Sequence, residues 1–204
     1  MIDLTSSGAV RLDPAGFEAL VDAARHGSAG APLEAKEALA DERLDGVMSV
    51  MLDPAAVMRL VVAGPDTRLE HRGWLANGVL VLLLGERPEL LQLMKTSPAF
   101  LTAALVRLTR MRPRHLPERV PAEFAAARLD ELVSPDRRLR APALAEVNAD
   151  FAWRLDCWWD GGGRTLTAVD GDLGLRIGYP DVDRLVPVTN TFCYRVLSTV
   201  LAST

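Results

Sequence analysis

The three histidines, His26, His71 and His115, are the side chains best suited to bind a metal ion or to move a proton near neutral pH. Each stands alone, because no cysteine or carboxylate occurs with it at the spacing of zinc or iron ligands. The sequence therefore predicts no metal site at these residues.

Other short motifs of catalysis are also missing: the sequence has no GxSxG elbow, no P-loop and no GxGxxG segment after a strand. The triple glycine at 161–163 lies between two predicted strands, where no helix N-terminus can bind a phosphate. Cys193, on the apolar face of a predicted helix, is expected to be a packed, unreactive thiol. Four aspartates could suggest calcium or magnesium, but they lie in two separate turns without ligand-loop spacing: Asp170, Asp172, Asp181 and Asp183. We predict a protein that is not an enzyme and has no cofactor.

The tryptophans are more informative. Trp153, Trp158 and Trp159 fall in one predicted strand, and only Trp74 lies elsewhere. Neighbouring residues of a strand point to opposite faces, so Trp158 and Trp159 cannot share one core. We expect one to be buried under a helix layer and the other to be accessible; packing of both is the alternative. An accessible tryptophan beside a flexible turn is typical of protein interfaces. The predicted protein-binding site comprises Trp158, Trp159, Asp160, Gly161, Gly162 and Gly163.

Length and composition indicate an ordinary globular protein. The chain has 204 residues, of which 49% are hydrophobic and 25% charged. A net charge of −4 speaks against nucleic-acid binding, and the arginine clusters at 110–114 and 137–140 are expected to be solvated loop charges. The longest apolar run, residues 79–84, is too short to span a membrane. The first residues lack the features of a signal peptide, so we expect a cytoplasmic protein.

Residues 154–201 form the clearest structural unit. Alternating segments separated by Gly and Asp turns predict a β-meander: 154–159, 164–170, 173–178 and 185–188. A helix follows from Asn190 with Thr189 as its N-cap, because Phe192, Cys193, Val196, Leu197, Val200 and Leu201 recur at helical spacing.

An earlier stretch resembles this unit. Residues 68–86 align without a gap on 154–172 at a shift of 86 (154 − 68), and two flanking matches occur at shifts of 85 and 84. Three matches at nearly one shift predict a tandem duplication. We therefore expect a single domain, 1–204, with copy one at about 9–95 and copy two at about 96–204, whose two hairpins are related by an approximate two-fold axis.

The remaining elements follow from local signals. In the first half we expect a strand at 10–12, a helix from Asp13-Pro14, a helix at 33–44, a strand at 47–52 and a helix from Asp53-Pro54. A hairpin turns at 73–77, and its second strand, 79–84, is expected to be covered on both faces. Residues 90–94 fit strand or helix, and the duplication favours strand. A helix begins at Ser97-Pro98.

In the second half, residues 112–121 are predicted to be a linker. A helix is expected at 122–133, a loop at 134–140 and a short helix at 142–148. Together these elements predict an α+β fold: a central, mainly antiparallel sheet and two helical groups related by a pseudo-two-fold axis.

This order of elements resembles the EspG-type chaperones of type VII (ESX) secretion in actinobacteria. The resemblance covers nearly the whole chain, from the strand-to-helix entry at 10–14, through 33–47 and 52–54, to the strand and helix at 185–201. It implies an internally duplicated α+β fold and a cytoplasmic protein that binds helical secretion substrates of the PE/PPE or WXG-like class. Substrate-binding members tend to have a long loop where this chain has the tight turn at 73–77.

Three hypotheses follow. The first is a non-catalytic chaperone or adaptor for a helical client, which an apolar, uncovered sheet face would favour. The second is a small enzyme or ligand-binding protein with a site assembled from dispersed residues, which a deep polar pocket with converging carboxylates or histidines would favour. The third is a homodimer that uses its exposed face for self-association.

Overall fold

The structure is a computed structural model and describes residues 1–4, 8–111 and 121–199. Within these residues the chain forms two compact units, one of Met1–Met58 and His71–Phe100 and the other of Arg59–Glu70 and Leu101–Thr204. Residues 112–120 of the predicted linker lie outside the described part of the chain. In the described segments no helix is long and apolar enough to cross a bilayer.

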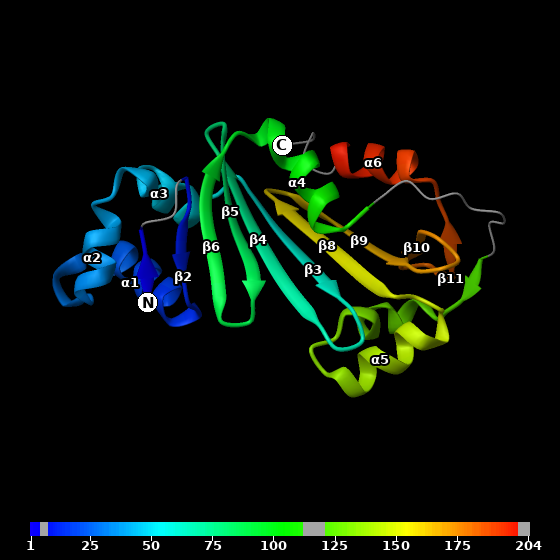
Figure 1. Ribbon diagram of the computed structural model, residues 1–204. Helices are drawn as coiled ribbons and strands as arrows, with labels where there is room; N and C mark the ends of the chain where they lie inside the picture. Colours follow the sequence, from blue (N-terminus) through cyan, green and yellow to red (C-terminus); the bar gives the residue numbers. More distant parts are fainter. Residues whose placement is uncertain (5–7, 112–120, 200–204) are drawn as a thin grey trace. The chain divides into compact units, whose positions relative to one another are not determined.

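The first unit packs three helices beside an antiparallel sheet (Figure 1). Its strands, in hydrogen-bonded order, are β1 (Ile2–Asp3), β2 (Val10–Leu12), β6 (Leu90–Thr96), β5 (Val79–Arg87) and β4 (Arg68–Ala76). Its helices are α1 (Pro14–His26), α2 (Leu33–Leu39) and α3 (Val47–Leu52), with the 3-10 turns η1 (Ser28–Gly30), η2 (Glu42–Leu44) and η3 (Pro98–Phe100). Strand β4 and the next strand, β3 (Ala56–Ala63), have residues in both units.

Local chemistry explains several elements of this unit. Asp13 caps α1 by accepting a hydrogen bond from the Gly16 amide at 2.7 Å, and Pro14 is the first helical residue. Both predictions about this helix start are confirmed. Residues 80–83 of β5 are all buried, as expected for a strand covered on both faces. Residues 90–96 form strand β6, which resolves the ambiguity of that segment.

Four predictions for the first unit are wrong in type or extent. The helix expected at 33–44 ends at Leu39, and residues 42–44 form the separate 3-10 turn η2. Residues 47–52 form helix α3, because Val47 and Val50 bury one helical face. The chain after Asp53 enters strand β3 and does not begin a helix. Strand β4 continues through the expected turn at 73–77, and the turn is Asn77-Gly78, where both residues have positive φ. Asn and Gly adopt this conformation more readily than other residues.

The second unit is an antiparallel sheet with helices on it (Figure 1). Its strands, in hydrogen-bonded order, are β3, β8 (Phe151–Trp159), β9 (Gly162–Asp170), β10 (Arg176–Tyr179), β11 (Val182–Pro187) and β7 (Ala122–Glu123). Its helices are α4 (Leu101–Leu108), the 3-10 helix η4 (Ala126–Val133), α5 (Arg137–Glu146) and α6 (Asn190–Thr199).

Helices cover parts of this second sheet. Helices η4 and α5 bury Leu132 and Leu144 against Ala152 of β8 and Val169 of β9 in one core. Helix α4 packs against α6, and Figure 1 shows this pair on the other side of the sheet from α5. Antiparallel strands with separate groups of helices confirm the predicted α+β class.

The predicted C-terminal meander and its helix are confirmed. Strands β8 to β11 follow in order, and the Thr189 hydroxyl accepts a hydrogen bond from the Phe192 amide at 3.0 Å at the start of α6. Val200 and Leu201 lie outside the described residues. Further upstream, the predicted helix at 122–133 is strand β7 followed by η4, and residues 137–146 form one helix. Asp136 starts this helix earlier than expected by capping the Arg138 amide at 2.8 Å.

Candidate functional site

The predicted site lies at the end of the β8–β9 hairpin. Trp159 pairs with Gly162, and Trp158 pairs with Gly163, so the connecting turn contains only Asp160 and Gly161. Gly162 and Gly163 are therefore residues of strand β9. The predicted four-residue turn at 160–163 is wrong, because pairing with β8 extends two residues further than the glycine run suggested.

The two tryptophans at this end differ in exposure, but neither is fully buried. Trp158 is 47% exposed and Trp159 is half-buried. The expectation that one of them lies under a helix layer is wrong. Their cross-strand partners are glycines, which have no side chain to cover an indole. The fully buried tryptophan of the strand is Trp153, which is paired with Ala168.

The glycines leave room for the indole rings. A Cβ atom at Gly162 would lie 2.9 Å from Nε1 of Trp159, and one at Gly163 would lie 3.2 Å from Cδ1 of Trp158. The Arg164 guanidinium carbon is also 5.9 Å from the centroid of the Trp159 ring, within cation–π range. The absence of side chains at 162 and 163 thus lets both indole rings lie against strand β9. These two glycines make room for the rings and do not provide the flexible turn that the sequence predicts.

We expect Gly162→Ala to displace the Trp159 ring, because the new methyl group would overlap the indole edge. The displacement should change the indole N–H signal of Trp159 in NMR spectra, while the free energy of unfolding changes by no more than about 1 kcal/mol. Gly161→Ala is the matched control. Its φ is +76° and no atom lies near the new Cβ, so it should strain the backbone without moving the ring. An unchanged Trp159 signal in Gly162→Ala would contradict this account.

Trp158 borders a polar hollow of about 350 Å³ in the second unit. Its walls come from segments far apart in the sequence, and they combine charged, polar and apolar side chains. The residues that line it are Arg59, Val61, Arg68, Asp130, Val133, Ser134, Pro135, Arg154, Asp156, Trp158 and Thr165.

The charged groups at this hollow are connected by ion pairs. Arg154 Nε donates to Asp156 at 2.9 Å, and its Nη1 donates to Asp130. Burial disfavours the charge of Arg154, but the hydrogen bonds and charges of Asp156 and Asp130 together outweigh this effect and raise the pKa of the guanidinium. The Thr165 hydroxyl also donates to Asp156, at 2.8 Å.

A second part of the network is built on Glu70. Arg59 donates to this carboxylate at 3.0 Å, and Arg68 donates to it at 3.4 Å. Arg68 also donates from Nε to the Val133 carbonyl oxygen at 3.1 Å. Each of the three carboxylates, Glu70, Asp130 and Asp156, thus has an arginine partner. These ion pairs connect the strands and η4, an arrangement that suits a structural network.

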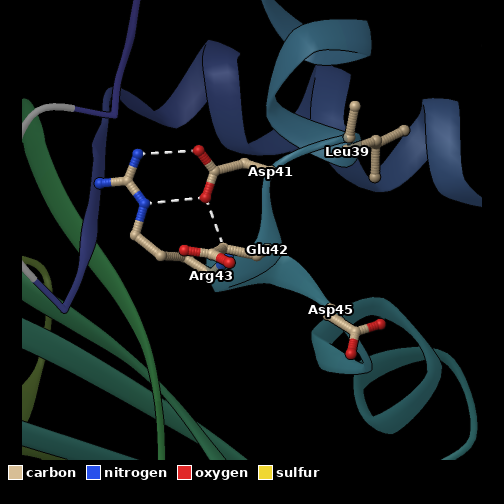
Figure 2. Close-up of a pocket in the computed structure, with 6 residues that line it drawn as sticks. Leu39, Asp41, Glu42, Arg43 and Asp45 are labelled. Carbon is tan, nitrogen blue, oxygen red and sulfur yellow. Dashed lines mark hydrogen bonds and ion pairs between the residues drawn. The ribbon is translucent and has the colours of Figure 1, made fainter.

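Figure 2 shows another surface hollow, in the first unit, which is lined by Leu39, Ala40, Asp41, Glu42, Arg43 and Asp45. Arg43 forms a bidentate pair with Asp41 through Nε at 2.8 Å and Nη2 at 2.9 Å. Hydrogen bonds from the Arg43 side chain and amide lower the pKa of Asp41 to about 2. Because Asp41 also caps η2, this pair fixes the local turn.

Other candidate residues bring no chemistry together. His26 is exposed, whereas His71 is buried and its Nδ1 accepts a hydrogen bond from the Gly85 amide at 3.2 Å; His115 lies outside the described residues. Cys193 is 0% exposed, which confirms that it is packed in the core. Burial raises the pKa of the Cys157 and Cys193 thiols to about 12. Among the described residues, no three His, Cys, Asp or Glu side chains are grouped as a metal site requires.

The sequence matches no protein-family model and no curated protein. The structure is similar to that of the Mycobacterium tuberculosis type VII secretion system chaperone EspG5, solved in complex with a PE25–PPE41 dimer. The alignment has a TM-score of 0.58, covers 95% of each chain and contains 11% identical residues. At this identity the likeness concerns the fold alone: the chain shares the α+β architecture of that solved structure.

The ionic hollow was missed by the sequence analysis. One signal for part of it was present, because Arg154, Asp156 and Trp158 alternate along one strand and so share a face. Arg59, Arg68 and Asp130 reach the same place only through the tertiary fold, and the sequence contains no spacing that links them.

Proposed function

We propose that the protein is a non-catalytic chaperone or adaptor that binds a helical protein client. The fold likeness to EspG5, a chaperone solved in complex with PE25–PPE41, is the observation that supports this proposal most. The proposed client is a helical secretion substrate of the PE/PPE or WXG-like class, bound before export in the cytoplasm.

The proposed contact surface comprises Trp158, Trp159, Asp160, Gly161, Gly162 and Gly163. Trp158 supports this choice because a large apolar ring is about half exposed at the end of a hairpin, seated against Gly163. A ring that is already fixed against its strand loses little conformational entropy when a partner covers it. The mechanism is therefore binding: the hairpin would cover an apolar patch of the client until the client is handed on.

Trp158→Ala is expected to release the client. Truncation of a central interface tryptophan typically costs about 2 kcal/mol or more, which weakens a micromolar complex roughly thirtyfold. The measurement is affinity purification of the tagged full-length protein from its native host, with quantification of co-purifying helical proteins. The variant should fold normally, because the side chain is exposed.

Phe192→Ala on α6 is the matched control, because this aromatic residue is 43% exposed and lies outside the proposed surface. It should retain the client. If Trp158→Ala and Phe192→Ala retain the same co-purifying proteins in equal amounts, the proposed surface is wrong. If no helical protein co-purifies with the unsubstituted protein, the chaperone proposal itself fails.

A ligand-binding protein is the second candidate, and the polar hollow is the observation that favours it. Its lining residues are dispersed over the sequence, and two carboxylates converge there. Against it, both carboxylates are paired with Arg154. Binding of a small free carboxylate to the hollow would support this candidate.

A further inference from the structure

The hollow that Trp158 borders is lined by three guanidinium groups, from Arg59, Arg68 and Arg154, and by the carboxylates of Asp130 and Asp156. Arg154, Asp156 and Trp158 alternate along strand β8, so their side chains leave the same face, and all three line the hollow. Arg59 of β3 lines it as well. The surface thus places an exposed indole beside hydrogen-bond donors, which suits a partner with neighbouring apolar and anionic groups.

Arg59 has hydrogen-bond donors that other described residues do not use. Its side chain is 42% exposed, more than those of Arg68 and Arg154, and one hydrogen bond joins its Nη2 to Glu70. Within the described residues its Nε and Nη1 have no acceptor, whereas Arg68 and Arg154 each use two nitrogens. A guanidinium with a free edge binds a carboxylate by charge-assisted hydrogen bonds, which are roughly twice as strong as neutral ones.

A helical client can meet this hollow from outside. A helix is about 10–12 Å across with its side chains, and the hollow is a surface depression of about 350 Å³, so a helix that lies across the opening can insert side chains into it. Side chains four residues apart on a helix have Cβ atoms about 5–6 Å apart, so two of them can enter the same hollow.

We propose that a client helix lies across this hollow, packs an apolar side chain on Trp158 and bonds an Asp or Glu carboxylate, one turn away, to Arg59. The inference rests on the proposed function, since it assigns the client's chemistry at the same hairpin. Arg164 takes no part, because it pairs with Cys157 in the sheet and lies over Trp159, on the opposite face.

Two alanine-based helical peptides serve as probes. Both carry a phenylalanine, and the residue four positions later is glutamate in one and glutamine in the other. Each is titrated into the ¹⁵N-labelled full-length protein, and the indole N–H signal of Trp158 is followed by NMR. The glutamate peptide is expected to bind about fivefold more tightly, the effect of a partly exposed ion pair. Arg59→Gln should abolish this preference, whereas Arg164→Gln should keep it.

Several results would overturn the inference. They are equal binding of the two peptides, a preference that persists in Arg59→Gln, and no shift of the Trp158 signal with either peptide. N-acetylglutamate amide that binds as tightly as the glutamate peptide would identify a small-carboxylate site instead. Trp158-dependent dimerisation in sedimentation velocity without peptide would identify a second copy of the chain as the occupant.

The peptide titration and the affinity purification test this inference and the proposed function separately. If binding of the native-host client requires Trp158 but not Arg59, the proposed function is supported and this inference is wrong. A peptide preference that depends on Arg59, found without any captured client, supports the inference about the surface and counts against the chaperone role.

Discussion

Trp153→Ala is expected to lower the free energy of unfolding by about 3–5 kcal/mol, the usual effect of truncating a buried tryptophan. Trp153 is 0% exposed near the start of β8 and is paired with the buried Ala168, so truncation of the ring leaves a cavity within the core. The measurement is urea unfolding followed by far-UV circular dichroism.

Trp158→Ala on the same strand is the matched control, and it should change the free energy of unfolding by no more than about 1 kcal/mol because the ring is exposed. Trp153→Phe retains an aromatic ring, so its free energy of unfolding should fall less than that of Trp153→Ala. If Trp153→Ala and Trp158→Ala lower the free energy of unfolding equally, Trp158 belongs to the core as much as Trp153 does. The proposed binding surface would then have to be given up.

Arg140→Ala is expected to destabilise the protein by about 3–5 kcal/mol. The buried guanidinium donates from Nε to the Gly64 carbonyl oxygen at 2.8 Å and from Nη2 to that of Pro65 at 3.3 Å. Its Nη1 donates to the carbonyl oxygens of Ser134 and Pro135. Removal of the side chain leaves the buried Gly64 carbonyl without this donor, which costs about 1–3 kcal/mol. The lost hydrogen bonds to the partly buried carbonyl oxygens of Pro65, Ser134 and Pro135 add to this cost, because bonds from a charged donor contribute about 1.5–3 kcal/mol each before water replaces them.

Arg137→Ala is the control for this prediction. Arg137 pairs with Asp66 at 2.7 Å in the same loop region, but both side chains are exposed, so the loss should stay below about 1 kcal/mol. Arg140→Lys should fall between the two, because an ammonium group cannot reach all the carbonyl oxygens at once. A loss for Arg140→Ala no larger than that for Arg137→Ala would show that the carbonyl groups find other partners. Urea unfolding again provides the measurement.

The burial of Arg140 contradicts the expectation for the arginine cluster at 137–140. Residues 137–140 were expected to be solvated loop charges, yet Arg140 is buried and bonded to backbone oxygens. Burial lowers the pKa of its guanidinium. In a run of arginines the sequence shows no difference between a solvated side chain and one that closes a loop.

The tandem duplication stays a prediction, with one correction to its register. The turns of the two hairpins are Asn77-Gly78 and Asp160-Gly161, which differ by 83 residues (160 − 77). The gap-free shift of 86 is therefore wrong for these hairpins. Because 83 and 86 differ by an odd number, the gap-free alignment would also match side chains on opposite faces of the strands.

Local signals were sufficient for much of the fold. The caps Asp13 and Thr189 predicted the starts of α1 and α6, since a cap hydrogen bond joins atoms only three residues apart. Alternation between turns likewise predicted strands β8 and β9. The run at 47–52 was misassigned because six largely apolar residues fit the period of a strand as well as that of a buried helix.

Only the local part of the candidate site could be predicted, because sequence patterns report on neighbouring residues and not on distant ones. From the sequence, Trp158, Trp159 and the glycines could be placed at the end of one hairpin, because this arrangement depends on neighbouring residues alone. Exposure depends on what the rest of the chain places over a side chain, so only the tertiary structure decided that Trp153 is buried and Trp158 is accessible. The arginines beside Trp158 likewise come together only because strands β3, β4 and β8 bring Arg59, Arg68 and Arg154 to one place.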